Sequence, residues 1–275
     1  MSTDETSDKS GPEAAVPGIE NQTDFGFRQV PEATKAPLVR AVFESVAERY
    51  DLMNDLMSAG IHRLWKDEMV AWLNPRPGQR MLDVAGGTGD VARRALSRMR
   101  PIAGGPAEGP GDGRVVVCDV NPRMLEIGRA QAIDDGVLDD IAFLCGDAEA
   151  LPFADRSFDL YTIAFGLRNV TRLERALAEA RRVLRPGGRF LCLEFAPSVA
   201  PFLQPLYDFY SFAFLPLLGR LVTGNREAYT YLVESIRRFP PQGEVSAMIA
   251  AAGLERPRYR NLTGGIAALY SAWRL

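Results

Sequence analysis

Histidine and cysteine are scarce in this chain of 275 residues, which has one histidine and three cysteines. A histidine-based metal centre or a Ser-His-Asp triad would depend entirely on His62, so zinc and serine hydrolases are poor matches. We assign no role to His62, which leaves a functional task and simple packing or capping both open, and we expect no metal. Cys118, Cys145 and Cys192 each lie in an apolar, strand-like run without metal-ligand or redox spacing, so we expect buried free thiols.

The sequence also lacks an excess of positively charged residues. The 32 Lys and Arg residues face 35 Asp and Glu residues, which leaves a net charge of −3. Domains that bind nucleic acids usually carry a basic excess. We therefore expect no nucleic-acid partner.

The sequence contains no clean membrane-spanning run of about 20 apolar residues. The most apolar segment, residues 199–222, includes three prolines together with Gln204, Asp208 and Arg220. Charged residues are costly inside a bilayer. The residues alone leave two interpretations of this segment open: it forms either a pair of core helices or an apolar lid over an apolar ligand.

The N-terminal segment is polar and acidic, and it begins "MSTDETSDKSGPEAAVPGIENQ". It has no apolar core, which a secretory signal needs, and its acidity is the reverse of a transit peptide. We expect residues 1–34 to form a disordered acidic tail. We also expect the chain to be cytoplasmic.

From residue 80 onward, short apolar runs alternate with helical patterns, which predicts a parallel sheet covered on both faces. The predicted strands are residues 80–85, 114–120, 141–147, 157–165 and 189–195. Helices are predicted at residues 89–99, around 124–127, at 171–184 and at 243–253. Thr171 and Glu174 form a capping-box pattern at the start of one of them. The last residues, from about 257, predict a closing antiparallel hairpin.

A glycine-rich turn, "LDVAGGTGD" at residues 82–90, follows the first strand. Gly86, Gly87 and Gly89 allow a ligand to approach the backbone, and the following helix N-terminus offers free N–H groups. The relaxed G-x-G-x-x-A pattern fits a nicotinamide enzyme or a nucleoside-binding methyltransferase equally well. Asp119 at the end of the second strand can accept both ribose hydroxyls, and Asp147 at the end of the third can accept from an adenine amine.

The order of these motifs, completed by "RVLRPGGRF", resembles the S-adenosylmethionine-dependent methyltransferases of the Rossmann-like class I. Further segments are similar to the ubiquinone/menaquinone biosynthesis C-methyltransferases, over a region from about residue 24 to the C-terminus. These segments are "VFESVAERYDLMNDLMSAGIHRLWK", "AFGLRNVT", "LEF", "YDFYSF", "YLVESIRRFP" and "NLTGGIAAL".

The resemblance implies an α/β fold with a seven-stranded, mostly parallel sheet, helices on both faces, an antiparallel last strand and a helical lid. It implies S-adenosyl-L-methionine as cofactor, held at Thr88, Asp119, Asp147 and Ala148. We divide the chain into the tail (1–34) and a methyltransferase domain (35–275). The parts of the domain are N-terminal helices (35–78), a cofactor-binding half (79–196), an apolar lid insertion (197–240), and a last helix with closing strands (241–275).

The resemblance also implies methylation of a ring carbon of 2-polyprenyl-6-methoxy-1,4-benzoquinol, demethylmenaquinol, or both. Such prenylated substrates partition into the bilayer. We therefore expect the protein to make transient, peripheral contact with a membrane surface, at the inner face of the plasma membrane. Contact with other quinone-biosynthesis enzymes is a family-level expectation. The substrate-side residues that we select are Tyr50, Asn54, Phe165, Tyr207 and Tyr210.

Arg168 and Asn169, in "DLYTIAFGLRNV", follow the fourth strand and are the residues we select for catalysis. Carbon methylation needs an electron-rich ring, which deprotonation of the neighbouring phenol supplies. Lowering a phenol pKa from about 10 to about 7 takes roughly 4 kcal/mol, and a guanidinium can contribute this through a charge-assisted hydrogen bond. In the family the matching Arg is proposed as a base acting through water, but Arg stays protonated in proteins. We expect Arg168 to stabilise the phenolate and Asn169 to orient a water or the ring oxygen.

Three other functions remain as alternatives. The first is a methyltransferase of the same fold with another small apolar or phenolic acceptor. The second is a cofactor-binding scaffold of a quinone-biosynthesis complex. The third, a nicotinamide oxidoreductase, is disfavoured by "GDAEALPF" and "RPGGRF". The motifs "FGLRN" and "NLTGGIAAL" favour the quinol methyltransferase.

Overall fold

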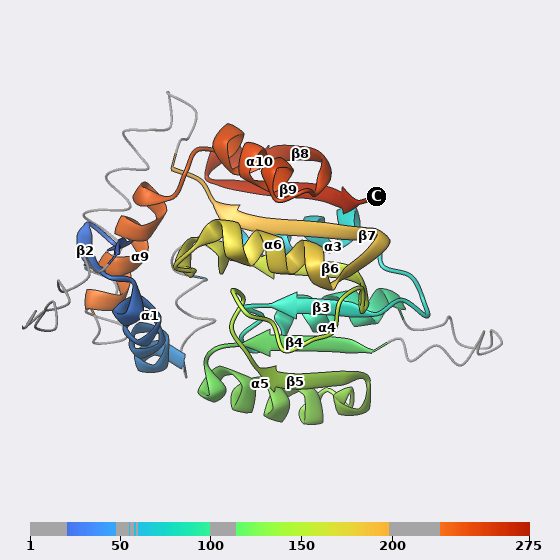
Figure 1. Ribbon diagram of the computed structural model, residues 1–275. Helices are drawn as coiled ribbons and strands as arrows, with labels where there is room; N and C mark the ends of the chain where they lie inside the picture. The colour runs from blue at the N-terminus through green and yellow to red at the C-terminus, as the bar shows by residue number, and fades with distance from the viewer. Residues whose placement is uncertain (1–20, 48–54, 56–57, 59, 100–113, 198–225) are drawn as a thin grey trace, which may run out of the picture.

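A seven-stranded β-sheet runs through the protein (Figure 1). The computed structural model describes residues 21–47, 55, 58, 60–99, 114–197 and 226–275. The strands of the sheet are β3 (Met81–Val84), β4 (Val115–Asp119), β5 (Ile141–Cys145), β6 (Phe158–Ala164), β7 (Leu184–Phe195), β8 (Glu255–Leu262) and β9 (Ala267–Arg274). Their order is β5-β4-β3-β6-β7-β9-β8, and only β9 runs antiparallel to its neighbours. The predicted α/β architecture with an antiparallel last strand is confirmed.

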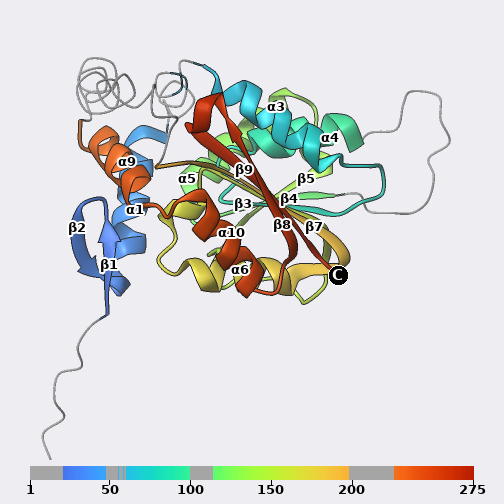
Figure 2. The same ribbon diagram turned by 90° about the horizontal axis from the view of Figure 1, so that it is seen from above.

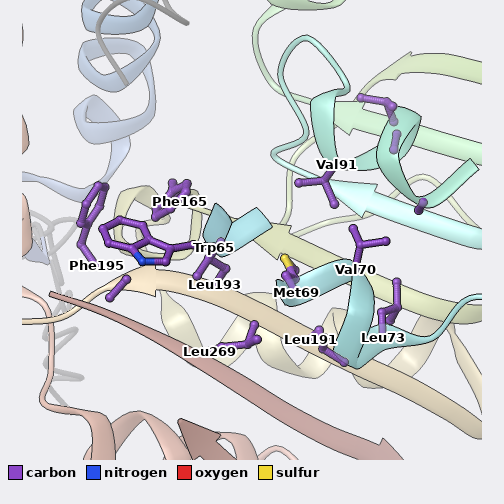
Figure 3. Close-up of a cluster of buried hydrophobic side chains, with 14 of the residues drawn as sticks. Trp65, Met69, Val70, Leu73, Val91, Phe165, Leu191, Leu193, Phe195 and Leu269 are labelled. Atoms are coloured by element: carbon purple, nitrogen blue, oxygen red, sulfur yellow. The ribbon is translucent and has the colours of Figure 1, made fainter. Parts of the chain in front are cut away.

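Helices cover both faces of the sheet, as the view in Figure 2 shows. One face carries α3 (His62–Leu73), α4 (Asp90–Met99) and α5 (Pro122–Asp134), and the other carries α6 (Leu173–Val183) and α10 (Gln242–Ala251). A separate apolar core lies between the sheet and the helices on each face, so the central strands β3, β6 and β9 are buried on both sides. In Figure 3, Trp65, Met69 and Leu73 of α3 lie over the β7 side chains Leu191 and Leu193.

The N-terminal region differs from the prediction of a disordered tail through residue 34. Residues 22–31 form an antiparallel hairpin, β1 (Gln22–Phe25) and β2 (Arg28–Pro31), and α1 (Glu32–Val46) follows directly. The reason is a long-range contact, because Phe25 stacks on Tyr231 of α9 (Arg226–Arg238) with ring centroids 4.4 Å apart. The prediction was therefore wrong for residues 21–34, and residues 1–20 lie outside the described part.

The start of α6 also differs from the prediction. No side chain of the helix itself caps it, so the Thr171–Glu174 capping box does not form. Instead, Glu149 Oε1 accepts from the N–H groups of Thr171 (2.6 Å) and Arg172 (3.1 Å). A carboxylate from a neighbouring loop therefore binds the two N–H groups directly before the helix, whereas the capping box would have bound those of Thr171 and Glu174.

The cysteines follow the prediction at two positions out of three. Cys118 and Cys192 are buried free thiols, whereas Cys145 is exposed because β5 is an edge strand of the sheet. No helix among the described residues is long and apolar enough to cross a membrane. The apolar segment 199–222 lies outside the described residues.

Candidate active site

A cavity lies at the carboxyl ends of β3, β4, β5 and β6, where ligands bind in open α/β sheets. It holds about 820 Å³ of space between atoms, open solvent included. Its opposite wall is α1, which stands beside α9 at this end of the sheet (Figure 1). The lining residues are Ala36, Val39, Arg40, Phe43, Ala85, Gly87, Asp119, Val120, Asn121, Met124, Gly146, Asp147, Ala148, Glu149, Phe165, Gly166, Asn169, Val170 and Thr171.

The backbone at the floor of the cavity is strained. Ala85 after β3 and Phe165 after β6 have φ angles of 49° and 57°, a left-handed conformation that non-glycine residues rarely adopt. Gly166 packs so closely that a Cβ there would lie 2.4 Å from the Cβ of Ala85. Strained residues of this kind cluster at functional sites, and here they let two neighbouring strand ends approach the same space.

Asp119 organises the glycine-rich loop from the end of β4. Its Oδ2 accepts from the N–H of Gly87 (2.9 Å), and its Oδ1 accepts from the N–H of Asn121 (2.8 Å). Burial raises the pKa of Asp119, and these backbone hydrogen bonds offset part of the rise. Each carboxylate oxygen keeps acceptor capacity for a further donor, such as a sugar hydroxyl.

The predicted cofactor residues divide into two groups. Gly87, Asp119, Asp147 and Ala148 line the cavity. The remaining three belong to the same turn between β3 and α4 (Asp90–Met99) but are not lining residues: Gly86, Thr88 and Gly89.

Asn121 is a polar residue of the cavity wall that was not predicted as a site residue. Its Oδ1 caps α5 by accepting from the N–H groups of Arg123 and Met124. Its Nδ2 is buried and has no hydrogen-bond partner among the described residues. The Asn-Pro pair before the helix could have identified the cap, but not the unused donor in the cavity wall.

Two contacts hold α1 over the cavity, and neither was predicted. Lys35 Nζ donates to the carbonyl of Val170 (2.9 Å), and burial lowers the pKa of this lysine. Glu32 pairs with Arg172, whose Nε lies 2.8 Å from Glu32 Oε2. Both contacts end on residues 170–172, so this segment fixes the position of the helical wall.

Arg168 and Asn169 lie on η3 (Leu167–Asn169), directly after the strained Phe165. Arg168 Nη1 donates to Glu194 Oε1 (2.7 Å) and to the carbonyl of Phe165 (2.6 Å), and its backbone N–H donates to Glu194 Oε2 (3.2 Å). Asn169 lines the cavity, but Arg168 is not a lining residue. The guanidinium is therefore balanced by a buried carboxylate that the sequence analysis did not identify.

Arg168 still has capacity for another partner. Its Nε is buried and has no hydrogen-bond acceptor among the described residues. Its guanidinium lies 5.5 Å from the ring centre of Phe195, which also packs against Phe165 and Trp65 (Figure 3). This apolar surrounding strengthens any charge-assisted contact that the guanidinium makes.

Of the five predicted substrate residues, Phe165 lines the cavity. The others lie outside the described residues: Tyr50, Asn54, Tyr207 and Tyr210. His62 is buried at the start of α3, where its backbone N–H donates to Ser58 Oγ and its Nδ1 lies 2.9 Å from the same oxygen. The histidine therefore has packing and hydrogen-bonding contacts away from the cavity lining.

The fold has many relatives among solved structures. An S-adenosylmethionine-dependent methyltransferase from Thermotoga maritima matches with a TM-score of 0.56 at 19% identity, covering 86% of this chain and 99% of that one. A methyltransferase of the same kind from Aquifex aeolicus matches with a TM-score of 0.52 at 16% identity, covering 76% of this chain and 89% of that one. The class I methyltransferase fold that the sequence resembled is confirmed.

Comparisons of sequence identify the family, whereas the solved structures identify only the fold. The family model described as "ubiE/COQ5 methyltransferase family" matches residues 29–274. The ubiquinone/menaquinone biosynthesis C-methyltransferase UbiE of Paracoccus denitrificans is 55% identical over 260 residues, covering 94% of this chain and 100% of that one. The enzyme of the same name from Brucella suis biovar 1 is 54% identical over 253 residues, covering 91% and 90%. This chain belongs to the ubiE/COQ5 methyltransferase family.

Proposed function

We propose that this protein is an S-adenosylmethionine-dependent C-methyltransferase of quinone biosynthesis. Its acceptor is the ring carbon of a benzoquinol with a polyprenyl chain and a methoxy group, of demethylmenaquinol, or of both. The observation that carries the proposal is the shared cavity, because Asn169 of the "FGLRN" segment lines the same space as Asp119 and Asp147.

The cavity walls fit the polar groups of an adenosine. Asp119 accepts hydrogen bonds from the two ribose hydroxyls, and Asn121 Nδ2 supplies the donor for a ring nitrogen or a sugar oxygen. Asp147 accepts from the exocyclic amine, and Gly87 leaves room for the amino acid portion. S-adenosylmethionine, when bound here, supplies an electrophilic methyl group on a sulfonium.

The acceptor side requires a phenol to lose its proton. Arg168 remains protonated, so the proton passes to water, while the positive charge of Arg168, directly before the cavity-lining Asn169, stabilises the phenolate. Glu194 accepts from the guanidinium through Arg168 Nη1, and the backbone N–H groups of Arg168 and Phe195 fix the carboxylate. Transfer of the methyl group to the ring carbon would break its bond to sulfur and leave a neutral thioether. The ring carbon then loses its hydrogen as a second proton to water, which restores the aromatic ring, and the phenolate oxygen takes up a proton from water to give the quinol.

The apolar segment 199–222, together with Tyr50, Asn54, Tyr207 and Tyr210, forms the quinol side of the site in this proposal. A prenylated acceptor partitions into lipid, so the enzyme meets it at a membrane surface. Flotation with liposomes that contain a prenyl-quinol tests this part. Absence of the protein from the floating fraction would contradict it.

The central experiment is methyl transfer in vitro. The purified protein is incubated with methyl-labelled S-adenosylmethionine and a short-chain 6-methoxy-benzoquinol or demethylmenaquinol, each kept reduced by dithionite. Label in a carbon-methylated quinol supports the proposal, and the preferred acceptor identifies the pathway. Tight cofactor binding without labelling of either quinol would instead favour another acceptor or a scaffold role.

A further inference from the structure

Tyr231 of α9 contacts Asn169 from outside the sheet. Its hydroxyl lies 3.1 Å from Asn169 Oδ1, across 62 residues of sequence. The helix begins directly after residues 198–225, so the contact links the C-terminal flank of the apolar segment to the cavity wall.

The hydrogen bonds around Asn169 define the orientation of its amide. The carbonyl of Phe165 can only accept, so the group facing it at 3.3 Å must be Nδ2. Oδ1 therefore faces Tyr231, and the Tyr231 hydroxyl must donate. One Nδ2 hydrogen is used by Phe165, which leaves the second hydrogen of a cavity-lining side chain for another acceptor.

The side chain of Tyr231, whose hydroxyl is the donor to Asn169, is fixed by its surroundings. The Tyr231 ring is buried and stacks on Phe25 of the N-terminal hairpin, with an angle of 23° between the rings. Burial raises the pKa of Tyr231 to about 12, so the hydroxyl keeps its proton at neutral pH. A rotation of the Asn169 amide would break both the Tyr231 and the Phe165 contact.

The same carbonyl joins this arrangement to the ion pair. Phe165 O accepts from Asn169 Nδ2 and from Arg168 Nη1, and the left-handed conformation of Phe165 presents it to both. Tyr231, Asn169, Phe165 and Arg168 thus form one connected hydrogen-bond network beside the cavity.

We propose that Tyr231 is a positioning residue for methyl transfer: it holds the Asn169 amide so that Nδ2 donates to the oxygen of the methyl acceptor. The acceptor class is a phenol or phenolate next to the carbon that is methylated. This inference rests on the proposed function, because it assigns Tyr231 a part in the same reaction.

The test is Tyr231→Phe, which removes the hydroxyl and keeps the stacked ring. We expect kcat to fall about 10-fold, which corresponds to about 1.4 kcal/mol in activation free energy. KM for the quinol and the Kd of S-adenosylmethionine should stay within about twofold. Tyr270→Phe, an equally buried position on β9, is the matched control and should keep the wild-type kcat.

A double-mutant cycle separates positioning from a general effect on stability. In an Asn169→Ala background, Tyr231→Phe should lower kcat by less than about twofold, because the amide that it orients is gone. Equal losses in both backgrounds, or an unchanged kcat in the single variant, would overturn the inference. If Tyr231→Phe does not fold, Phe25→Leu replaces it, since loss of the stack should reduce kcat only where Asn169 is present.

Failure of the proposed function has a different signature. A wild-type enzyme that methylates neither quinol contradicts the function and removes the basis of this inference. An active wild type with an equally active Tyr231→Phe variant contradicts only the role of Tyr231.

Discussion

Arg168 and Glu194 form a buried ion pair, with Nη1 and Oε1 2.7 Å apart and side chains that are 3% and 0% exposed. Such a pair contributes little net stability compared with apolar residues, but breaking it leaves a charge uncompensated in the interior. The effect of this ion pair is to fix the position of the Arg168 guanidinium beside the strained end of β6.

Glu194→Gln should lower the free energy of unfolding by about 3 kcal/mol, because it leaves the Arg168 charge buried without a counterion. Urea denaturation measures this change. The double variant Arg168→Met with Glu194→Gln should recover part of the loss, since no buried charge remains. Glu234→Gln, a half-buried control in α9, should change little. An unchanged urea midpoint in Glu194→Gln would refute the expectation.

Asn121→Ser should separate the two functions of this side chain. Serine is also a good N-cap, so stability should change by less than about 0.5 kcal/mol, whereas the Nδ2 donor is lost. We expect the Kd of S-adenosylmethionine to rise about 5-fold, which corresponds to about 1 kcal/mol for one hydrogen bond. Calorimetric titration measures the Kd, and Asn121→Ala serves as the variant that loses both functions. A wild-type Kd in Asn121→Ser would show that the unused donor does not bind cofactor.

His62 should titrate with a pKa of about 4, because burial and the neighbouring Lys66 disfavour its charged form. Since the folded pKa lies below the unfolded value of about 6.5, stability is retained above pH 6.5 and lost as the pH falls toward 4. The loss from this group amounts to at most about 3 kcal/mol.

The measurement for His62 is direct, because the chain has one histidine. A proton NMR titration follows its single C2–H resonance. Leu64→Ser, at an exposed position of the same helix, is the control and should leave the pKa unchanged. A resonance that titrates near pH 6.5 would contradict the buried environment.

Gly166→Ala should damage the cavity floor, since the added Cβ would lie 2.4 Å from the Cβ of Ala85. We expect a loss of about 1–3 kcal/mol in the free energy of unfolding from overpacking, together with weaker cofactor binding. Gly243→Ala in α10 is the matched control, because its Cβ would meet nothing within 4 Å. That variant should gain up to about 1 kcal/mol from helix propensity. Equal stabilities of the two variants would argue against the close approach.

The strands and helices of the sheet were predictable, because each depends on a local pattern. The apolar run of β4, for example, predicts a strand without knowledge of its neighbours. The Phe25–Tyr231 stack, the Lys35–Val170 contact and the Tyr231–Asn169 contact join residues more than 60 positions apart. No single-sequence pattern encodes such pairs, so the hairpin and the position of the predicted helix α1 over the cavity were missed.

The candidate site was predictable where a residue type matched a known chemical task. Asp119 and Asp147 at strand ends, and Asn169 after β6, lie at the cavity as expected. Glu194 lies within an apolar strand and could be recognised only through its pairing with Arg168 across 26 residues. The unused donor of Asn121 depends on what surrounds it, which the order of residues does not specify.

Glu149 belongs to the cavity wall and also accepts hydrogen bonds from the N–H groups of Thr171 and Arg172, directly before α6. The loop that follows β5 is therefore joined by hydrogen bonds to the segment before α6 and cannot be changed separately from it. An engineer who exchanges this loop to change nucleoside preference must retain a carboxylate at position 149 and the same spacing from β5. Otherwise the exchange removes two hydrogen bonds from the segment before α6, and a redesign aimed at one wall of the cavity also alters the segment that follows Asn169.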